Sequence, residues 1–341
     1  MAKRLDAAKS YHGDQRSWHF TDVPGALGCN GCAEFSTCGG LRTVRALFNC
    51  LDYCQACTGD CGSVCPHSPT NFVRRVREIG GNFDLSPIPR TTQLNVSTIP
   101  SVVPIIFHRG QMREPHRLGA ACVPFHRVFS MRDGTPLYPA AIDIRDAFNL
   151  HRDTPLILTG VAQDRWVEAW WGLGHQRRRL VISSLKDLGI ALVTVPNFSL
   201  TMDEPRWTDL HAMKRIGICH WEFQAEGMPA ALHINARTDR DYDRWIEFLL
   251  DRPEITHVSV ELLTGGSRPK RMQWHAEKIV SLAAHVGRPL HLVVRGGTAH
   301  IPEFTSAFAH LTILTANSFM KTVMRQKLIP FGNDQLQSVP A

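Results

Sequence analysis

The sequence predicts an α/β protein in which a (β/α)8 TIM-like barrel follows a cysteine-rich metal-binding module. Short segments rich in Val, Ile and Leu alternate with longer amphipathic segments from residue 102 onward. The short segments lack strict apolar–polar alternation, which is typical of parallel strands buried on both faces. Eight of the ten cysteines lie between Cys29 and Cys65, ahead of the first strand segment. A six-stranded partial barrel is the second choice, and an open doubly wound sheet is the third.

These features divide the chain into four regions. Residues 1–84 form the cysteine-rich metal or Fe–S module, and 85–101 form a linker rich in Pro, Ser and Thr. Residues 102–330 form the barrel and 331–341 a tail. Charged residues make up 20% of the chain and hydrophobic residues 43%, a composition that predicts a folded globular protein.

The charge and the apolar runs indicate the kind of partner. The net charge of +7 mildly favours an anionic small molecule or nucleic acid as the partner. Apolar runs such as Val102–Phe107 are far shorter than the roughly 20 residues of a membrane span. The segment Met1–Ser10 is charged and lacks the apolar core of a secretory signal. We therefore expect a cytoplasmic protein with no membrane partner.

The cysteine spacing favours a metal centre over disulfides. Short Cys-x2-Cys loops let neighbouring thiolates converge on one metal, whereas disulfide frameworks are typical of small secreted domains. The expected metal ligands are Cys29, Cys32, Cys38, Cys50, Cys54, Cys57, Cys61 and Cys65. Eight thiolates suit two four-ligand sites, or an open three-ligand cluster with further ligands elsewhere.

The dense run that ends the module favours an Fe–S cluster, most simply [4Fe–4S]. Cys54-x2-Cys57-x3-Cys61-x3-Cys65-Pro66 resembles the ferredoxin-type run, with a middle spacing one residue longer. Zinc is the alternative, because Cys29-x2-Cys32 and Cys54-x2-Cys57 also form two knuckles.

A second resemblance concerns the same run. Cys50-x3-Cys54-x2-Cys57 is similar in spacing to the cluster motif of radical S-adenosylmethionine enzymes. In that family three cysteines hold a [4Fe–4S] cluster and leave one iron open for S-adenosylmethionine. Ala56 stands where that family carries an aromatic residue. The resemblance implies S-adenosylmethionine as a further cofactor and radical-type chemistry.

Eight strands and the helices between them are expected from residue 102 onward. The expected strands are Val102–Phe107, Pro139–Ile144, Pro155–Thr159, Ala191–Val195, Ala230–Ile234, His257–Leu262, Leu290–Val294 and Leu311–Leu314, of which the second has the weakest pattern. The expected helices are Leu41–Leu51, Asn71–Ile79, Trp166–Leu188, Trp207–Ala225, Asp241–Leu250 and Arg271–Val286.

Polar residues at the carboxyl ends of these strands are the candidate site, because barrel enzymes carry their sites there. Those strand-end residues are His108, Arg109, Asp143, Arg145, Gln163, Asp164, Asn197, Ser199, Asn235, Arg237, Glu261, Arg295, Asn317, Ser318 and Lys321. Several cations with few acids suit a substrate that carries phosphate or carboxylate. Glu261 is the candidate acid–base residue, with Asn197, Asn235 and Arg237 as further catalytic candidates.

The loop after the seventh strand is the candidate anion site. Arg295, Gly296 and Gly297 follow that strand directly, and glycines let a backbone approach a ligand. Barrels often bind phosphate between their seventh and eighth loops. The expected substrate-binding residues are Arg295, Gly296, Gly297, Asn317, Ser318 and Lys321.

Residues 193–263 resemble a family of unknown function from bacteria, plasmids and phages. The resemblance rests on Val195-Pro196-Asn197-Phe198-Ser199, Pro205, Glu226-Gly227 and His233-Ile234-Asn235-Ala236-Arg237. It implies a barrel-like α/β domain, supplies no reaction, and marks Asn197, Ser199, Asn235 and Arg237 as site residues.

The leading hypothesis is an Fe–S barrel enzyme that acts on a phosphate-bearing substrate, such as a nucleotide or nucleic acid. The first alternative is a zinc-stabilised module that binds nucleic acid or protein without catalysis. The second is a nucleoside- or base-modifying barrel with a structural metal.

Overall fold

A computed structural model describes residues 64–65, 69–108, 114–200, 206–263, 269–324, 326–330 and 336–340. Its strands are β1 (Val102–Pro104), β2 (Ala121–Pro124), β3 (Leu156–Thr159), β4 (Ile190–Thr194), β5 (Ala230–His233), β6 (His257–Glu261), β7 (His291–Arg295), β8 (His310–Thr315), β9 (Gln326–Pro330) and β10 (Leu336–Pro340). Its helices are α4 (Pro69–Arg77), α5 (Ala141–Ala147), α6 (Asp164–Gly172), α7 (Gly174–Lys186), α8 (Arg206–Ala225), α9 (Asp239–Leu250), α10 (Pro269–Val286), α11 (Ile301–Ala307) and α12 (Asn317–Val323), with 3-10 turns η2 (Phe125–Arg127) and η3 (Thr298–His300).

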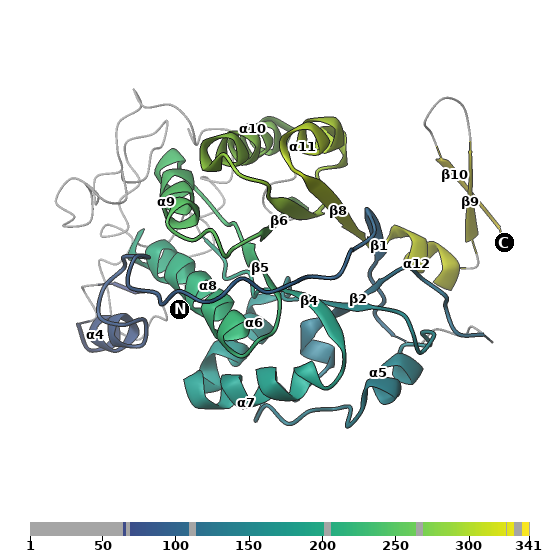
Figure 1. The fold of residues 1–341 in the computed structure, drawn as a ribbon, viewed down its shortest axis with the longest axis horizontal. Helices are drawn as coiled ribbons and strands as arrows, with labels where there is room; N and C mark the ends of the chain where they lie inside the picture. The colour runs from purple at the N-terminus through teal and green to yellow at the C-terminus, as the bar shows by residue number, and fades with distance from the viewer. Residues whose placement is uncertain are drawn as a thin grey trace, which may run out of the picture.

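The eight strands β1 to β8 form one parallel sheet that curls into a nearly closed, TIM-like barrel. Their order is β1-β8-β7-β6-β5-β4-β3-β2, so β1 and β2 are the two edges (Figure 1). A single parallel bridge between Ile105 and Cys122 joins those edges, and the Ile106 amide donates to the Cys122 carbonyl at 2.8 Å. The barrel predicted from sequence is therefore confirmed.

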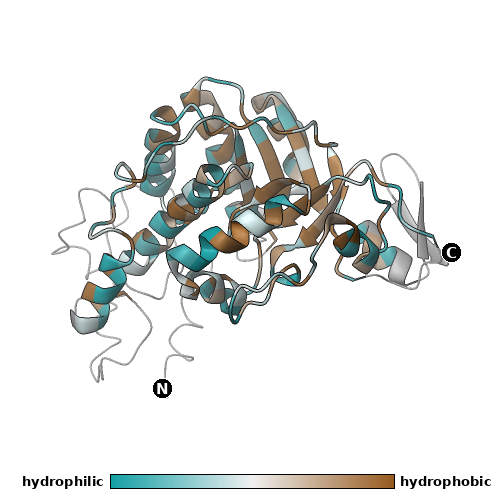
Figure 2. Ribbon diagram, turned by 60° about the horizontal axis from the view of Figure 1, so that its bottom comes forward, coloured by the Kyte–Doolittle hydropathy of each residue, from teal (hydrophilic) through white to brown (hydrophobic). Residues whose placement is uncertain are grey.

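Apolar side chains pack on both faces of the barrel sheet. Alternate strand residues point inward, and the interior cluster includes Val103, Cys122, Ile157, Leu192 and Val293. The intervening residues point outward and pack under the helices in a second, larger cluster. Figure 2 shows the hydrophobic strands at the centre and helices with mixed hydropathy around them. None of the described helices is both long enough and apolar enough to cross a membrane.

The second strand is the element that sequence reasoning placed wrongly. Residues 139–144 were expected to form it, but Ala141–Ala147 is helix α5, and the second strand is Ala121–Pro124. The Asp143 carboxylate accepts a hydrogen bond from the Ala140 amide at 2.9 Å and so starts the helix. A short apolar run has no periodicity that separates strand from helix, and Pro124 cuts the true strand short.

Asp143 and Arg145 consequently do not lie at the carboxyl ends of the strands. The buried Arg145 guanidinium donates to the carbonyls of Thr154, at 3.2 Å, and Leu188, at 3.0 Å. Those two residues precede β3 and β4, so Arg145 ties together the opposite end of the barrel.

The helix expected over 166–188 is two helices, because Gly174 interrupts it. Gly174 adopts a φ of 75°, which glycine tolerates far better than other residues, and it separates α6 from α7. The expected helix over 41–51 lies outside the described residues. Strands β9 and β10 form an antiparallel hairpin, with Leu336 opposite Pro330.

Residues 78–91, which we call the strap, run along the barrel between α4 and β1. Figure 1 shows the whole chain between α4 and β1, of which the strap is the first part, in dark blue as it crosses the molecule. The strap contains no helix or strand, yet Phe83, Leu85 and Ile88 are buried in the outer cluster. Residues 85–101, expected as an extended linker, therefore begin with side chains packed on the barrel.

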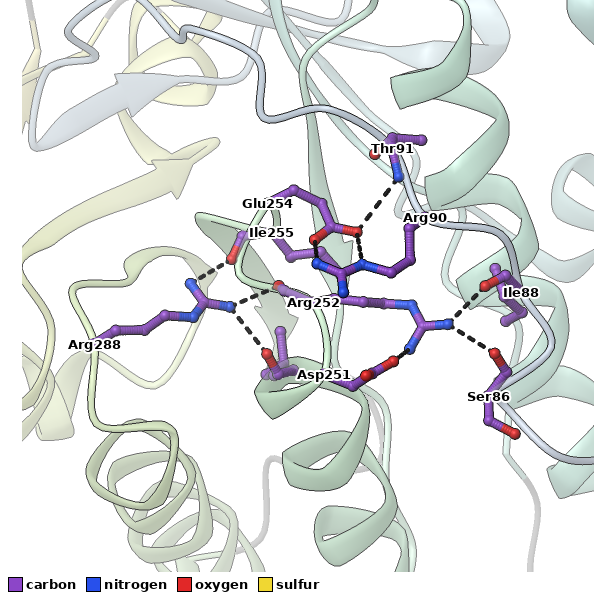
Figure 3. Close-up of polar contacts among 10 residues, drawn as sticks. Ser86, Ile88, Arg90, Thr91, Asp251, Arg252, Glu254, Ile255 and Arg288 are labelled. Carbon is purple, nitrogen blue, oxygen red and sulfur yellow. Dashed lines mark hydrogen bonds and ion pairs between the residues drawn. The ribbon is translucent and has the colours of Figure 1, made fainter.

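Barrel arginines hold the strap through its backbone. Arg252 donates to the carbonyls of Ser86, at 3.0 Å, and Ile88, at 2.6 Å (Figure 3). Arg90 of the strap forms a two-pronged ion pair with Glu254, whose carboxylate also accepts from the Thr91 amide. These contacts satisfy strap carbonyls that no regular secondary structure would otherwise pair.

Three histidines lie side by side at the start of strands β6, β7 and β8. The ring centroids of His257 and His291 are 4.5 Å apart, and those of His291 and His310 are 4.4 Å apart. Burial, then the charge of His310, lowers the pKa of His257 to about 4. Burial, then His257 and His310, lowers the pKa of His291 to about 3. The folded barrel therefore keeps His257 and His291 neutral in mild acid.

We expect the free energy of unfolding to fall as the pH drops from about 6.5 towards 4. The unfolded chain protonates its histidines near 6.5, whereas folded His257 and His291 resist protonation, so acid favours unfolding. Above pH 6.5 both states are neutral and the effect disappears. Urea unfolding at several pH values measures the slope. His291→Gln should reduce this slope of unfolding free energy against pH by up to about 1.4 kcal/mol per pH unit.

The exposed His285 supplies the matched control for that measurement. His285→Gln should keep the parent slope. An unchanged slope in His291→Gln would contradict the assignment.

Candidate functional site

Two neighbouring cavities lie at the carboxyl ends of the strands. The larger one, the mouth cavity, has a volume of about 630 Å³ and is lined by Phe107, His126, Arg127, Val161, Ala162, Gln163, Arg165, Trp166, Asn197, Glu261, Leu263 and Arg295. The smaller one, the side cavity, has a volume of about 270 Å³ and is lined by Asp164, Asn197, Ser199, Leu200, His233, Ile234, Asn235, Ala236, Arg237, Tyr242, Val260, Glu261, Leu262, Arg271, His275 and Ile279. Asn197 and Glu261 line both.

Glu261 lies where the two cavities meet. It is the last residue of β6, and its register partner on β7 is Arg295. Both side chains are half-buried, and the Glu261 carboxylate accepts a hydrogen bond from the Leu263 amide at 2.8 Å. Glu261 lines both cavities, whereas Arg295 lines only the mouth cavity and Arg237 lines only the side cavity.

The polar residues after β4 and β5 also tie the neighbouring loops together. Asn197 Oδ1 accepts from the Ala162 amide at 3.2 Å, and Asn235 Nδ2 donates to the Phe198 carbonyl at 2.9 Å. The Ser199 hydroxyl donates to Asp164 at 2.6 Å. Asn197, Asn235 and Ser199 each line a cavity and at the same time fix a loop beside it.

Gly296 and Gly297 have a structural reason for being glycine. Their φ values are 86° and 64°. An added Cβ would lie 2.9 Å from a Leu263 carbon at Gly296, and 2.5 Å from a Leu262 carbon at Gly297. The pair therefore lets the loop after β7 pack tightly on the end of β6.

The rest of the expected anion loop lines neither of these two cavities. Gly296, Gly297, Asn317 and Lys321 are absent from both linings, although Arg295 lines the mouth. Asn317 is exposed at the start of α12, where its amide donates to the Thr315 hydroxyl. The side chain of Ser318 lies outside the described residues.

His108 and Arg109 are the two candidate residues expected after the first strand. The His108 ring packs edge-on against Phe319 on α12, with centroids 5.1 Å apart. Arg109 lies outside the described residues.

Sequence reasoning missed a group of aromatic and cationic residues in the mouth cavity. The rings of His126 and Trp166 are parallel, with centroids 5.2 Å apart. The Arg165 guanidinium lies 4.5 Å from the Trp166 ring centroid. His126 and Arg127 belong to turn η2, directly after β2, so misplacing that strand also hid its loop.

Three residues of the side cavity were missed because they lie on helices. Tyr242 is on α9, and Arg271 and His275 are on α10. Arg271 and His275 are four residues apart, a spacing that places both on one helix face. That spacing was the available signal.

Arginines dominate the charge of the two cavities. Five arginines, namely Arg127, Arg165, Arg237, Arg271 and Arg295, face two carboxylates, Asp164 and Glu261. Guanidinium groups suit phosphate and carboxylate because their N–H groups form a planar fork. The arrangement can bind an anionic ligand beside a carboxylate.

The expected cysteine ligands lie outside the described residues, with the exception of Cys65. Cys65 is buried, and the amide of the neighbouring Val64 donates to the Thr208 hydroxyl at 3.0 Å. Thr208 is in the first turn of α8, which follows β4. Among the described residues no group of three or more His, Cys, Asp or Glu side chains is arranged to hold a metal ion.

The fold and these cavities define a TIM-like α/β barrel protein with a cationic site at the usual end of the barrel. No protein-family model matches the chain, and a search of curated proteins finds no significant match. The resemblance over residues 193–263 stays a prediction from the sequence.

Proposed function

We propose that this protein is a barrel enzyme that binds a phosphate-bearing substrate in the two neighbouring cavities and uses Glu261 as its acid–base residue. The observation that carries the proposal is that five arginines line the two cavities that share this carboxylate. Phosphate groups need such cations, and proton transfer needs a carboxyl group within reach of the substrate. Glu261 lines both cavities, so a ligand in either one lies beside it.

The proposal includes an Fe–S cluster held by the cysteine-rich segment. Its support is the spacing of Cys50, Cys54, Cys57, Cys61 and Cys65. When bound, such a cluster would supply electron transfer. The contact between Val64 and Thr208 supports a position near the site, because the first turn of α8 follows the carboxyl end of β4.

Binding and turnover should respond differently to two substitutions at the mouth. Arg295→Ala should weaken the binding of nucleoside monophosphates about tenfold, because it removes a charge-assisted contact. Glu261→Gln should leave binding intact and abolish turnover, because the amide keeps the shape and cannot transfer a proton. Calorimetric titration measures the first effect, and product analysis with the same nucleotides measures the second.

Arg152, whose side chain is 77% exposed in the loop before β3, gives a matched control. Arg152→Ala should bind as the parent does. Equal affinity in Arg295→Ala and the parent, together with unchanged turnover in Glu261→Gln, would refute the proposed site.

A further inference from the structure

A chain of three polar side chains forms one wall of the side cavity. Tyr242 and His275 are 3% and 8% exposed, and Tyr242 Oη lies 2.8 Å from His275 Nδ1. Arg271 Nε donates to His275 Nε2 at 3.4 Å. All three residues line the cavity.

The chain fixes the direction of its hydrogen bonds. Burial, then the charges of Arg271 and Arg237, holds the pKa of His275 well below its ordinary value, so the ring is neutral. A neutral imidazole carries one proton. Because Nε2 accepts from Arg271, the proton is on Nδ1, which donates to the Tyr242 oxygen.

The Tyr242 hydroxyl proton is therefore not used in the bond to His275. The hydroxyl can rotate its proton about the C–O bond towards the cavity that Tyr242 lines. Burial, then the nearby Asp241 carboxylate, raises the pKa of Tyr242, so the hydroxyl stays a donor at neutral pH. The cavity thus has a neutral O–H donor beside the guanidinium groups of Arg237 and Arg271.

Arg237 is held in place by its own backbone and side chain. Its amide donates to Asp241 Oδ2 at 2.7 Å, and its Nε donates to the Leu200 carbonyl. These bonds orient the Arg237 guanidinium in the loop after β5. Arg271 comes from a different element, the first turn of α10. Two cations and one hydroxyl from three separate elements therefore converge on a cavity of about 270 Å³.

We propose that the side cavity binds the phosphate group of the substrate, with Tyr242, Arg237 and Arg271 as its ligands. The inference rests on the proposed function and moves the phosphate away from the loop after β7. Arg295 then contacts the remainder of the substrate in the mouth cavity.

The mouth cavity indicates what that remainder is. His126 and Trp166 stack on each other and both line this cavity, and such aromatic rings favour contact with a planar ring of a ligand. Since Glu261 and Asn197 line both cavities, an extended ligand crosses Glu261. The substrate class is a phosphomonoester with a planar ring, such as a nucleoside monophosphate.

Titration of the full-length protein with inorganic phosphate tests the phosphate ligands. Tyr242→Phe removes one oxygen and should weaken phosphate binding about tenfold, and Arg271→Gln should weaken it by at least as much. Tyr138→Phe is the matched control, because Tyr138 is a half-buried tyrosine that packs on Phe148 away from both cavities. It should bind phosphate as the parent does. Urea unfolding midpoints check that each variant is folded.

A second titration tests the binding of the planar ring of the substrate. A nucleoside monophosphate should bind more tightly than inorganic phosphate, and Trp166→Ala should remove that difference while leaving the affinity for inorganic phosphate unchanged. A ¹⁵N spectrum should show His275 as the Nδ1–H tautomer. The Nε2–H tautomer would overturn the assignment of Tyr242 as a donor.

The outcomes separate this inference from the proposed function. If Arg295→Ala weakens phosphate binding while Tyr242→Phe and Arg271→Gln do not, the phosphate lies at the loop after β7, and only the inference fails. If the parent binds neither inorganic phosphate nor a nucleoside monophosphate at millimolar concentration, both fail. If Trp166→Ala leaves the preference for the nucleotide intact, the stacked pair of His126 and Trp166 is not part of the site, and the substrate class is overturned.

Discussion

Arg206→Met should lower the free energy of unfolding by about 3–5 kcal/mol, the cost of leaving buried charges without their partner. Arg206 is buried at the start of α8 between two carboxylates that are fully buried, Asp209 and Asp241. It donates to Asp209 at 2.9 Å and forms an ion pair with Asp241. Methionine fills much of the same space and supplies no positive charge, so both carboxylates lose their ion pair with Arg206. Urea denaturation of the variant and the parent measures the loss.

The same substitution should also disturb the side cavity. Asp241 Oδ2 accepts hydrogen bonds from the amides of Arg237, at 2.7 Å, and Thr238, at 3.0 Å, and so fixes the loop after β5. The matched control is Arg240→Met, because Arg240 pairs with the exposed Glu247 and Asp243 and such surface pairs contribute about 0–1 kcal/mol. If both variants lost a similar amount of unfolding free energy, the burial of the Arg206 ion pairs would not explain the loss, and the prediction would be wrong.

Cys57→Ser should lose most of the bound metal and much of its solubility. Cysteine-rich segments with few apolar residues bury little core, so metal binding supplies most of their folding free energy. Metal analysis and the visible absorption spectrum of anaerobically purified protein measure the effect. A brown parent protein with iron and sulfide identifies the Fe–S cluster, whereas a colourless parent protein with zinc identifies the zinc alternative.

Cys219 is the matched control for the metal measurement. It is fully buried within α8, and burial raises the pKa of its thiol to about 12, so it stays a neutral core residue. Cys219→Ala should keep the full metal content at some cost in stability. Equal metal content in Cys57→Ser and the parent would refute the ligand assignment.

The strands were predictable where an apolar run was bounded clearly at both ends. The run His257–Leu262 becomes β6, and Gly287 marks the end of α10 before β7. Ala121–Pro124 was not predictable, because four residues ending in proline carry too little pattern. Local pattern cannot show that this short segment joins β1 through Cys122, since that contact arises only when the barrel closes.

The candidate site was predictable to the extent that residues at the ends of strands build it. Glu261, Asn197 and Arg237 follow directly from the ends of β6, β4 and β5. Tyr242 and His275 come from helices, and their meeting depends on how α9 and α10 pack, which no periodicity specifies. For Gly296 and Gly297 the sequence suggested contact with a ligand. The structure explains both glycines instead by their close packing on Leu262 and Leu263.

The strap has a consequence for where the smallest independently folding piece of this protein begins. A fragment that starts at β1 would lack Ile88 and Phe83 and would leave Arg252 without the two carbonyls that it binds. Glu254 would lose Arg90 in the same cut. Removal of the chain before residue 102 therefore takes away part of the hydrophobic core as well as the eight clustered cysteines. The barrel and the stretch from α4 through the strap should unfold together as one cooperative unit, and a protease cut within the strap should weaken the whole barrel.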